Sequence, residues 1–206
     1  MLHPTLDEAK ELAKRGIGNL VPIYREVTAD LETPVSAFLK VRTGKYSFLL
    51  ESVEGGERMA RYSFIGTQPY RVLRTGAGEE WEGDPLVPLQ QEVSRFREIP
   101  VEGVPAFTGG AIGYVSYDAV RHFEPRVKPP AADELGIPEA VFLFCDSMVV
   151  FDHIRHTIKV IAHCRLDGDI DASYRQAAFR IDEIVEKLNN PTVQLPPEEV
   201  GAVLRT

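Results

Sequence analysis

The sequence predicts an α+β fold, a mostly antiparallel sheet with helices packed outside it, and three stretches carry that prediction. The apolar, β-branched run 140–151 and the alternating run 157–164 flank a short polar tip, which is typical of a β-hairpin. The shorter runs 46–50 and 61–65 flank a turn around two glycines and predict a second hairpin. Apolar residues at helical spacing in 174–188 predict a long amphipathic helix.

Composition limits the classes of protein that the chain can belong to. At 206 residues, with 44% hydrophobic residues, it can fill the core of one large domain or two small ones. A formal net charge of -8 argues against binding to nucleic acid or to an anionic membrane surface, since both need clustered positive charge. We find no secretory signal and no apolar run of membrane-spanning length, so we expect a cytoplasmic protein. Cys145 and Cys164 form no CxxC pair, and we expect reduced core thiols.

Two elements are predicted before residue 30. Thr5 and Glu8 match a Thr-x-x-Glu capping box, and apolar residues at helical spacing continue to Gly16, so we expect an amphipathic helix there. Residues 19–27 are typical of a strand. Pro22 within it favours a position at the edge of the sheet, because proline cannot donate a hydrogen bond to a neighbouring strand.

Two further helices have recognisable N-termini. Thr33 supplies an N-cap and Pro34 stands at the first helical position of the next predicted helix. Its expected apolar face consists of Val35, Phe38 and Leu39. Asp169 or Asp171 can cap the long helix near the end of the sequence.

The segment between these helices should contain another hairpin and another helix. Residues 70–75 alternate polar and apolar side chains, and a glycine turn would return the chain as a partner strand over 79–82, which carries Trp81. Helical spacing of apolar residues in 85–99 predicts a helix that Pro100 ends.

The hairpin of 140–164 also fixes an expected relationship between the cysteines. Pairing that is symmetric about Ile154 and Arg155 would place Cys145 opposite Cys164. Such a pairing could permit a disulfide, but a reducing cytoplasm favours two free thiols.

Several polar clusters have both a functional and a structural interpretation, and for these the structural one is favoured. Gly109, Gly110 and Gly113 lack the Gly-Lys-Ser/Thr of a phosphate-binding loop, so glycines that allow a bulge or close backbone packing are the better interpretation. His153 and His156 lie on a hairpin tip with no evident third ligand, which favours a solvated turn over a metal site.

Two charged clusters are Asp118 with Arg121 and His122, and Glu57 with Arg58 and Arg61. The first could form an acid–base pair and the second could hold an anion. Charged residues are common on surfaces, and acid–base catalysis needs groups within hydrogen-bonding reach in a pocket, which spacing does not show. An exposed charged surface is therefore the favoured interpretation of both.

The most specific polar feature is Glu51-Ser52, at the end of the run 46–50 and beside the two glycines of the turn. The carboxylate can pair with an ammonium group, and the hydroxyl or a backbone amide can bind a polar partner, which is how a zwitterionic amino acid would be held. An ordinary strand end with a hydrogen-bonded turn is the alternative.

Several motifs in the same order resemble the N-terminal region of component I of anthranilate synthase, the large, chorismate-utilising subunit. The motifs are Asp30–Phe38, Leu49-Leu50-Glu51-Ser52, Gly56–Gly66, Gly109–Asp118 and Val149–His153. The resemblance covers 19–190. It implies an N-terminal component I region over 1–190, part of an α/β/β/α sandwich, and a linker over 191–206 leading to a C-terminal chorismate-binding half that this sequence lacks.

The resemblance also implies a regulatory site. In that family the Leu-Leu-Glu-Ser motif belongs to the tryptophan feedback site, which assigns Leu50, Glu51 and Ser52 to inhibitor binding. Some members have a lysine ten residues after the serine. Here Tyr62 stands at that place, with Arg61 beside it as a further candidate.

The implied activity of the complete enzyme is the conversion of chorismate to anthranilate and pyruvate, with Mg²⁺ and with ammonia from a glutamine amidotransferase, component II. Because the family's catalytic and magnesium residues lie in its C-terminal part, no catalytic or metal residue is assigned here, and we expect these 206 residues alone to be inactive. Two alternatives stay open. One is the large component of aminodeoxychorismate synthase, in the folate pathway, and the other is a non-catalytic amino-acid-binding or assembly module.

Overall fold

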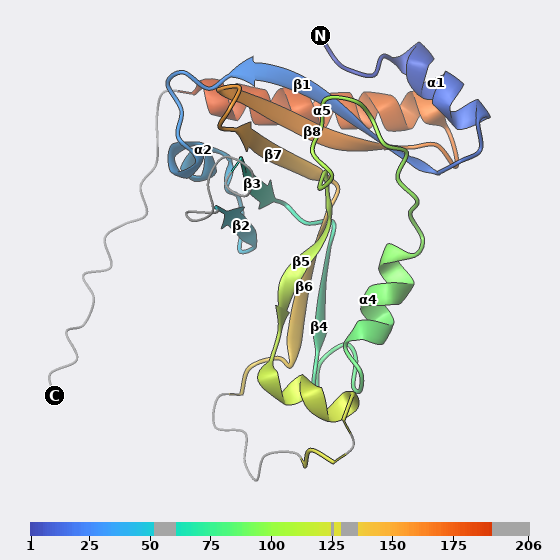
Figure 1. Cartoon of the computed structure of the whole chain (residues 1–206), viewed down its shortest axis with the longest axis vertical. Helices are drawn as coiled ribbons and strands as arrows, with labels where there is room; N and C mark the ends of the chain where they lie inside the picture. The colour runs from blue at the N-terminus through green and yellow to red at the C-terminus, as the bar shows by residue number, and fades with distance from the viewer. Residues whose placement is uncertain (52–60, 125, 129–135, 191–206) are drawn as a thin grey trace, which may run out of the picture.

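The computed structural model describes residues 1–51, 61–124, 126–128 and 136–190. These residues form two antiparallel sheets with helices packed against them (Figure 1). The predicted α+β class, with mostly antiparallel sheet and outer helices, is confirmed.

The larger sheet has five strands in the order β1-β8-β7-β3-β2. Their bounds are β1 Leu20–Thr28, β8 Thr157–Arg165, β7 Ser147–Asp152, β3 Tyr62–Thr67 and β2 Ser47–Leu50. The strand with Pro22 lies at the edge, as predicted. The predicted hairpin of 46–65 is also confirmed, since β2 pairs with β3 and Leu50 lies opposite Phe64.

The smaller sheet has three strands in the order β4-β6-β5. Their bounds are β4 Arg71–Thr75, β6 Ala140–Cys145 and β5 Gly110–Val115. The run 140–151, predicted as one strand, is therefore two strands in different sheets, separated at Asp146. This residue turns the chain, its side chain pairs with Arg180, and its carbonyl accepts a hydrogen bond from the amide of His163 over 2.8 Å.

The register predicted for the later hairpin is correct, because Ser147 pairs with Ala162 and the pairing is symmetric about the predicted tip. It does not extend to the cysteines. Cys145 lies opposite Gly110 in the smaller sheet, and Cys164 lies opposite Val21 in the larger one. Both thiols are buried and free, as expected.

Two predictions for the segment 70–99 are wrong. The stretch 79–82 forms no strand: Trp81 makes a single bridge to Thr75, and β6 is the partner of β4. The predicted helix of 85–99 is shorter, with α4 spanning Leu86–Val93. It ends early because the following backbone bonds to the beginning of β1 instead, where the amide of Ile99 donates to the carbonyl of Leu20 over 2.8 Å.

The other helices begin where the sequence predicts. They are α1 Leu6–Lys14, α2 Pro34–Val41 and α5 Ile170–Asn189, and a 3-10 helix, η1, spans Tyr117–His122. The capping box of Thr5 and Glu8 is formed, and the Asp169 carboxylate caps α5 by accepting from the amide of Ala172 over 2.9 Å. The face expected for α2 is partly wrong: Ala37 and Val41 are buried, while Val35 is half exposed.

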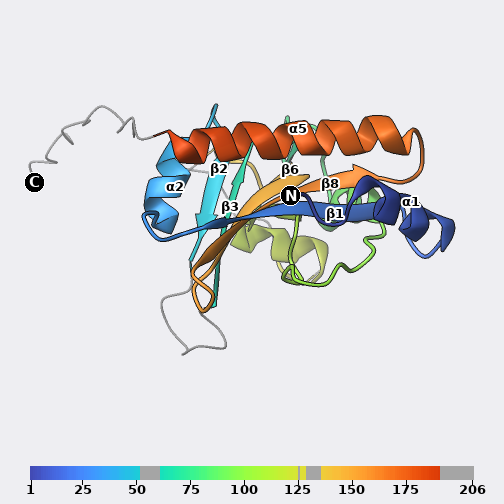
Figure 2. The ribbon, with the colours of Figure 1, turned by 90° about the horizontal axis from the view of Figure 1, so that it is seen from above.

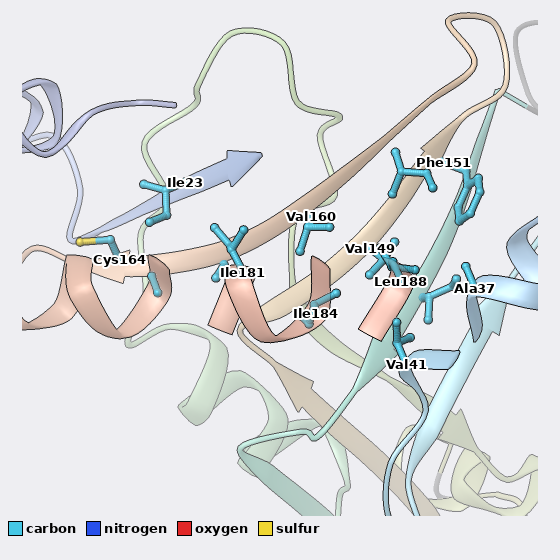
Figure 3. Close-up of a cluster of buried hydrophobic side chains, with 14 of the residues drawn as sticks. Ile23, Ala37, Val41, Val149, Phe151, Val160, Cys164, Ile181, Ile184 and Leu188 are labelled. Atoms are coloured by element: carbon cyan, nitrogen blue, oxygen red, sulfur yellow. The ribbon is translucent and has the colours of Figure 1, made fainter. Parts of the chain in front are cut away.

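The main core lies between α5 and the larger sheet, which the helix covers along its length (Figure 2). Ala177, Ile181, Ile184 and Leu188 of α5 are buried in this core. Figure 3 shows the last three beside side chains of the strands. Burial of each large aliphatic side chain contributes about 1.5–3 kcal/mol to stability. A smaller cluster on the sheet includes Met148, with Phe107 of the β4–β5 connection packed against it. In the described part of the chain, no helix is long and apolar enough to cross a membrane.

Candidate functional site

The predicted regulatory residues lie at one end of the larger sheet. Leu50 ends β2 and is 44% exposed, and Glu51 follows it on the surface. Because β2 and β3 are antiparallel and Leu50 pairs with Phe64, Glu51 and Arg61 lie at the same end of the hairpin. Ser52 lies outside the described residues, as do Glu57 and Arg58, so the structure places only part of the predicted site.

Arg61 is held by a buried carboxylate of the neighbouring strand β7. Its Nε donates to Oδ1 of Asp152 over 3.1 Å and its Nη2 donates to Oδ2 over 2.7 Å. Asp152 is 3% exposed and also accepts from the amides of Ile154 and Arg155. The guanidinium lies 4.8 Å from the ring centroid of Tyr62, within the range of a cation–π contact.

These contacts fix the charge of the pair. Burial alone would raise the pKa of Asp152, but the hydrogen bonds from Arg61 and from the two backbone amides outweigh it and hold that pKa below its ordinary value. The hydrogen bond to Asp152 in turn raises the pKa of Arg61. The ion pair thus anchors the beginning of β3 to the end of β7, at the end of the sheet where the exposed Glu51 also lies. The sequence pattern does not assign Asp152 to the site, although this carboxylate directly follows the apolar run 140–151.

The charged cluster in η1 is arranged around a residue that the sequence did not indicate. Arg121 and His122 both contact Glu139, over 2.8 Å from Nη2 and 2.9 Å from Nε2, whereas Asp118 is not their partner. Glu139 is 7% exposed and directly precedes β6. Its contacts hold η1 against the smaller sheet, so this cluster has a structural role.

The histidines of the hairpin tip also have a structural setting. His153 Nε2 lies 2.7 Å from the hydroxyl of Ser63, and His156 adopts a positive φ of 53° in the turn. Within the ranges that the structure describes, no group of three His, Cys, Asp or Glu residues could hold a metal ion.

The glycines of β5 and its approach allow close packing. A Cβ on Gly113 would lie 1.8 Å from the carbonyl oxygen of Val141, and one on Gly109 would lie 2.4 Å from Cε1 of His163. The structural interpretation of the motif is confirmed, because a side chain at either position would collide with its neighbour.

A cavity of about 430 Å³ opens where the two sheets meet, beside α4 and α5. Tyr70, Phe96 and Phe144 give it aromatic walls. The ion pair of Asp146 with Arg180 and the close contact of Glu98 with His163 also line it. No local pattern in the sequence indicates this cavity, since its lining comes from segments that are far apart along the chain.

Comparison with known proteins places this two-sheet fold in a family. A family model described as chorismate binding enzyme matches residues 45–203, and the chain belongs to the chorismate binding enzymes. Within that family, its similarity is to component 1 of anthranilate synthase. It is 44% identical to the probable anthranilate synthase component 1 of Schizosaccharomyces pombe, over 96% of this chain and 40% of that protein. It is 40% identical to anthranilate synthase component 1 of Acetivibrio thermocellus, over 89% of this chain and 39% of that protein.

A solved structure supports the fold. The crystal structure of anthranilate synthase component I from Streptococcus pneumoniae matches with a TM-score of 0.53 and 24% identity, over 81% of this chain and 37% of that one. The resemblance seen in the motifs is thus confirmed by whole-chain comparison. The chain spans about 40% of the length of the curated relatives it matches.

Proposed function

We propose that the chain is the N-terminal, regulatory portion of component 1 of anthranilate synthase. The complete enzyme, a lyase of the cytoplasm, would convert chorismate and ammonia to anthranilate and pyruvate in tryptophan biosynthesis. The observation that supports this best is the extent of the similarity, because relatives named anthranilate synthase component 1 match at 44% and 40% identity over 96% and 89% of the chain.

The exposed end of the β2–β3 hairpin would carry part of a tryptophan feedback site. The half-exposed Leu50 offers an apolar contact for an indole ring, and the exposed carboxylate of Glu51 can accept hydrogen bonds from an ammonium group. Ser52 would complete this side of the site. Arg61, held by Asp152, would keep the hairpin end in place. Tryptophan would inhibit by binding an inactive arrangement of the enzyme more tightly than the active one.

The chemistry itself would take place outside this chain. The catalytic and Mg²⁺-binding residues would lie in a separate, C-terminal half. These 206 residues alone would then be inactive, and component II, a glutamine amidotransferase, would supply ammonia to the complete enzyme.

The feedback site is tested by Ser52→Phe in the complete enzyme. We expect turnover of chorismate to be retained and inhibition by tryptophan to be lost, because the larger side chain would fill the space of the ligand. Ser94→Phe is the matched control, since Ser94 is exposed at the end of α4, an element that lies apart from β2 and β3 (Figure 1), and it should stay sensitive to tryptophan. If Ser52→Phe remains fully inhibited, the assignment of this site is wrong.

Two further measurements separate the alternatives. Product analysis of the complete enzyme distinguishes anthranilate with pyruvate from aminodeoxychorismate. Calorimetric titration of this chain with tryptophan addresses the non-catalytic module: tight binding by the chain alone would favour an independent amino-acid sensor, whereas undetectable binding is expected of half a site, which leaves the ligand exposed.

A further inference from the structure

The cavity between the two sheets is separate from the proposed feedback site and shares none of its residues. We propose that it binds a small aromatic carboxylate. Its volume of about 430 Å³ falls within the range of small-molecule sites and suits a ligand of one or two rings.

The aromatic walls offer packing surfaces for such a ring. The ring of Tyr70 lies 6.4 Å from that of Phe96, edge to face, and 6.1 Å from that of Phe144. The guanidinium of Arg165 lies 5.5 Å from the ring centroid of Phe96 and covers one side of it. Edge-to-face contacts such as that of Tyr70 with Phe96 stabilise aromatic partners beyond the simple burial of apolar area.

Arg180 provides the group that recognises the carboxylate. It projects from α5 into the cavity with one third of its side chain exposed, and one of its nitrogens, Nη1, contacts Asp146. A guanidinium has five donors, and within the described part of the chain only that contact engages it. Its remaining donors can therefore form the paired hydrogen bonds that carboxylates make with arginine. Arg165 differs, because Asp167 already occupies its Nε and Nη2.

Both acidic side chains of the cavity are engaged by neighbouring groups. Asp146 is paired with Arg180, and Glu98 accepts a hydrogen bond from Thr108 and lies 3.3 Å from Nε2 of His163. These carboxylates could in addition hold an ammonium group. The carboxylate could thus belong either to a simple aromatic acid or to an aromatic amino acid.

Titration calorimetry on the 206-residue chain tests the proposal, with 3-phenylpropionate as the aromatic acid and L-phenylalanine as the aromatic amino acid. Acetate, which lacks the ring, and 3-phenylpropanamide, which lacks the charge, are the control probes. We expect at least one of the two aromatic carboxylates to bind, and acetate and the amide to bind at least about tenfold more weakly, a difference of about 1.4 kcal/mol. Tighter binding of L-phenylalanine would identify the amino acid, and tighter binding of 3-phenylpropionate the simple acid.

Variants locate the site. Arg180→Gln should weaken binding at least about tenfold, while Arg175→Gln, an exposed position on the same helix that does not line the cavity, should leave it unchanged. Gln176→Trp should abolish binding by filling the cavity from a residue that is exposed and so tolerant of change. Circular dichroism confirms that each variant is folded. The proposal would be overturned if neither aromatic carboxylate bound the wild-type chain at millimolar concentration. It would also be overturned if Arg180→Gln and Gln176→Trp bound as tightly as the wild type.

Discussion

The guanidinium of Arg61 donates to both carboxylate oxygens of Asp152, from Nε to Oδ1 over 3.1 Å and from Nη2 to Oδ2 over 2.7 Å. The pair joins the beginning of β3 to the end of β7, at the end of the sheet where Leu50 and Glu51 also lie. The position of the proposed regulatory residues therefore depends on an ion pair that does not itself need to touch a ligand.

Removal of the carboxylate should destabilise the fold. Asp152→Ala leaves two backbone amides and the Arg61 guanidinium without their acceptor, and we expect the free energy of unfolding to fall by about 2–3 kcal/mol. Urea denaturation measures this change. Asp30→Ala, at an exposed position, is the matched control and should change stability by less than about 0.5 kcal/mol. Equal effects of the two substitutions would show that the pair contributes nothing.

The same pair makes a prediction for pH. The folded state holds the pKa of Asp152 below its ordinary value, so its ionised form contributes stability that is complete above the unfolded pKa of about 4. That contribution is lost as the pH falls through the lower, folded pKa. The difference in unfolding free energy between wild type and Asp152→Asn should hence be constant from about pH 7 to pH 5 and shrink below about pH 4. A difference that grows on acidification would contradict the assigned direction.

Local patterns predicted those elements whose partners are near in sequence or whose faces repeat regularly. The apolar face of α5 and the hairpin register of β7 and β8 follow from spacing alone. The division of 140–151 at Asp146 could not be predicted, because it depends on Arg180 in a distant helix. The helix predicted for 85–99 is longer than α4 for a similar reason, because the last residues of that stretch bond to the beginning of β1.

The candidate sites were predictable to different degrees. The motif around Glu51 could be recognised from neighbouring residues, and the structure adds Asp152, the partner of Arg61. The cavity could not be recognised, because Tyr70 and Arg180 become neighbours only when both sheets are folded.

A second buried carboxylate should be important for the smaller sheet. Glu139→Gln would lose the ion pair with Arg121 and alter the hydrogen bond with His122, and we expect a loss of about 1–2 kcal/mol in the free energy of unfolding. Asp118→Asn, in the same 3-10 helix but not a partner of those residues, should be nearly neutral. Guanidinium denaturation of both variants checks the assignment, and a larger effect from Asp118→Asn would refute it.

The two thiols should be unreactive until the chain unfolds. Burial raises the pKa of Cys145 to about 12 and also raises the pKa of Cys164, so little thiolate exists in the native protein. With a disulfide reagent such as dithionitrobenzoate at about pH 8, we expect no rapid reaction of the native chain. Both thiols should react in guanidinium. A fast reaction of one thiol in the native state would show that its side chain is accessible.

Finally, the close approach of β5 to β6 can be tested at one glycine. In Gly113→Ala the new methyl group would lie 1.8 Å from the carbonyl oxygen of Val141, and backbone atoms cannot move aside as the end of a flexible side chain can. We expect a loss of about 3 kcal/mol or more in unfolding free energy, at the upper end of the cost of overpacking. Gly168→Ala is the control, because a methyl group there would have no neighbouring atom within 4 Å. Thermal unfolding compares the two. If Gly113→Ala unfolds at the same temperature as Gly168→Ala, the strands do not approach as closely as described, and the glycines before and within β5 would need a different explanation.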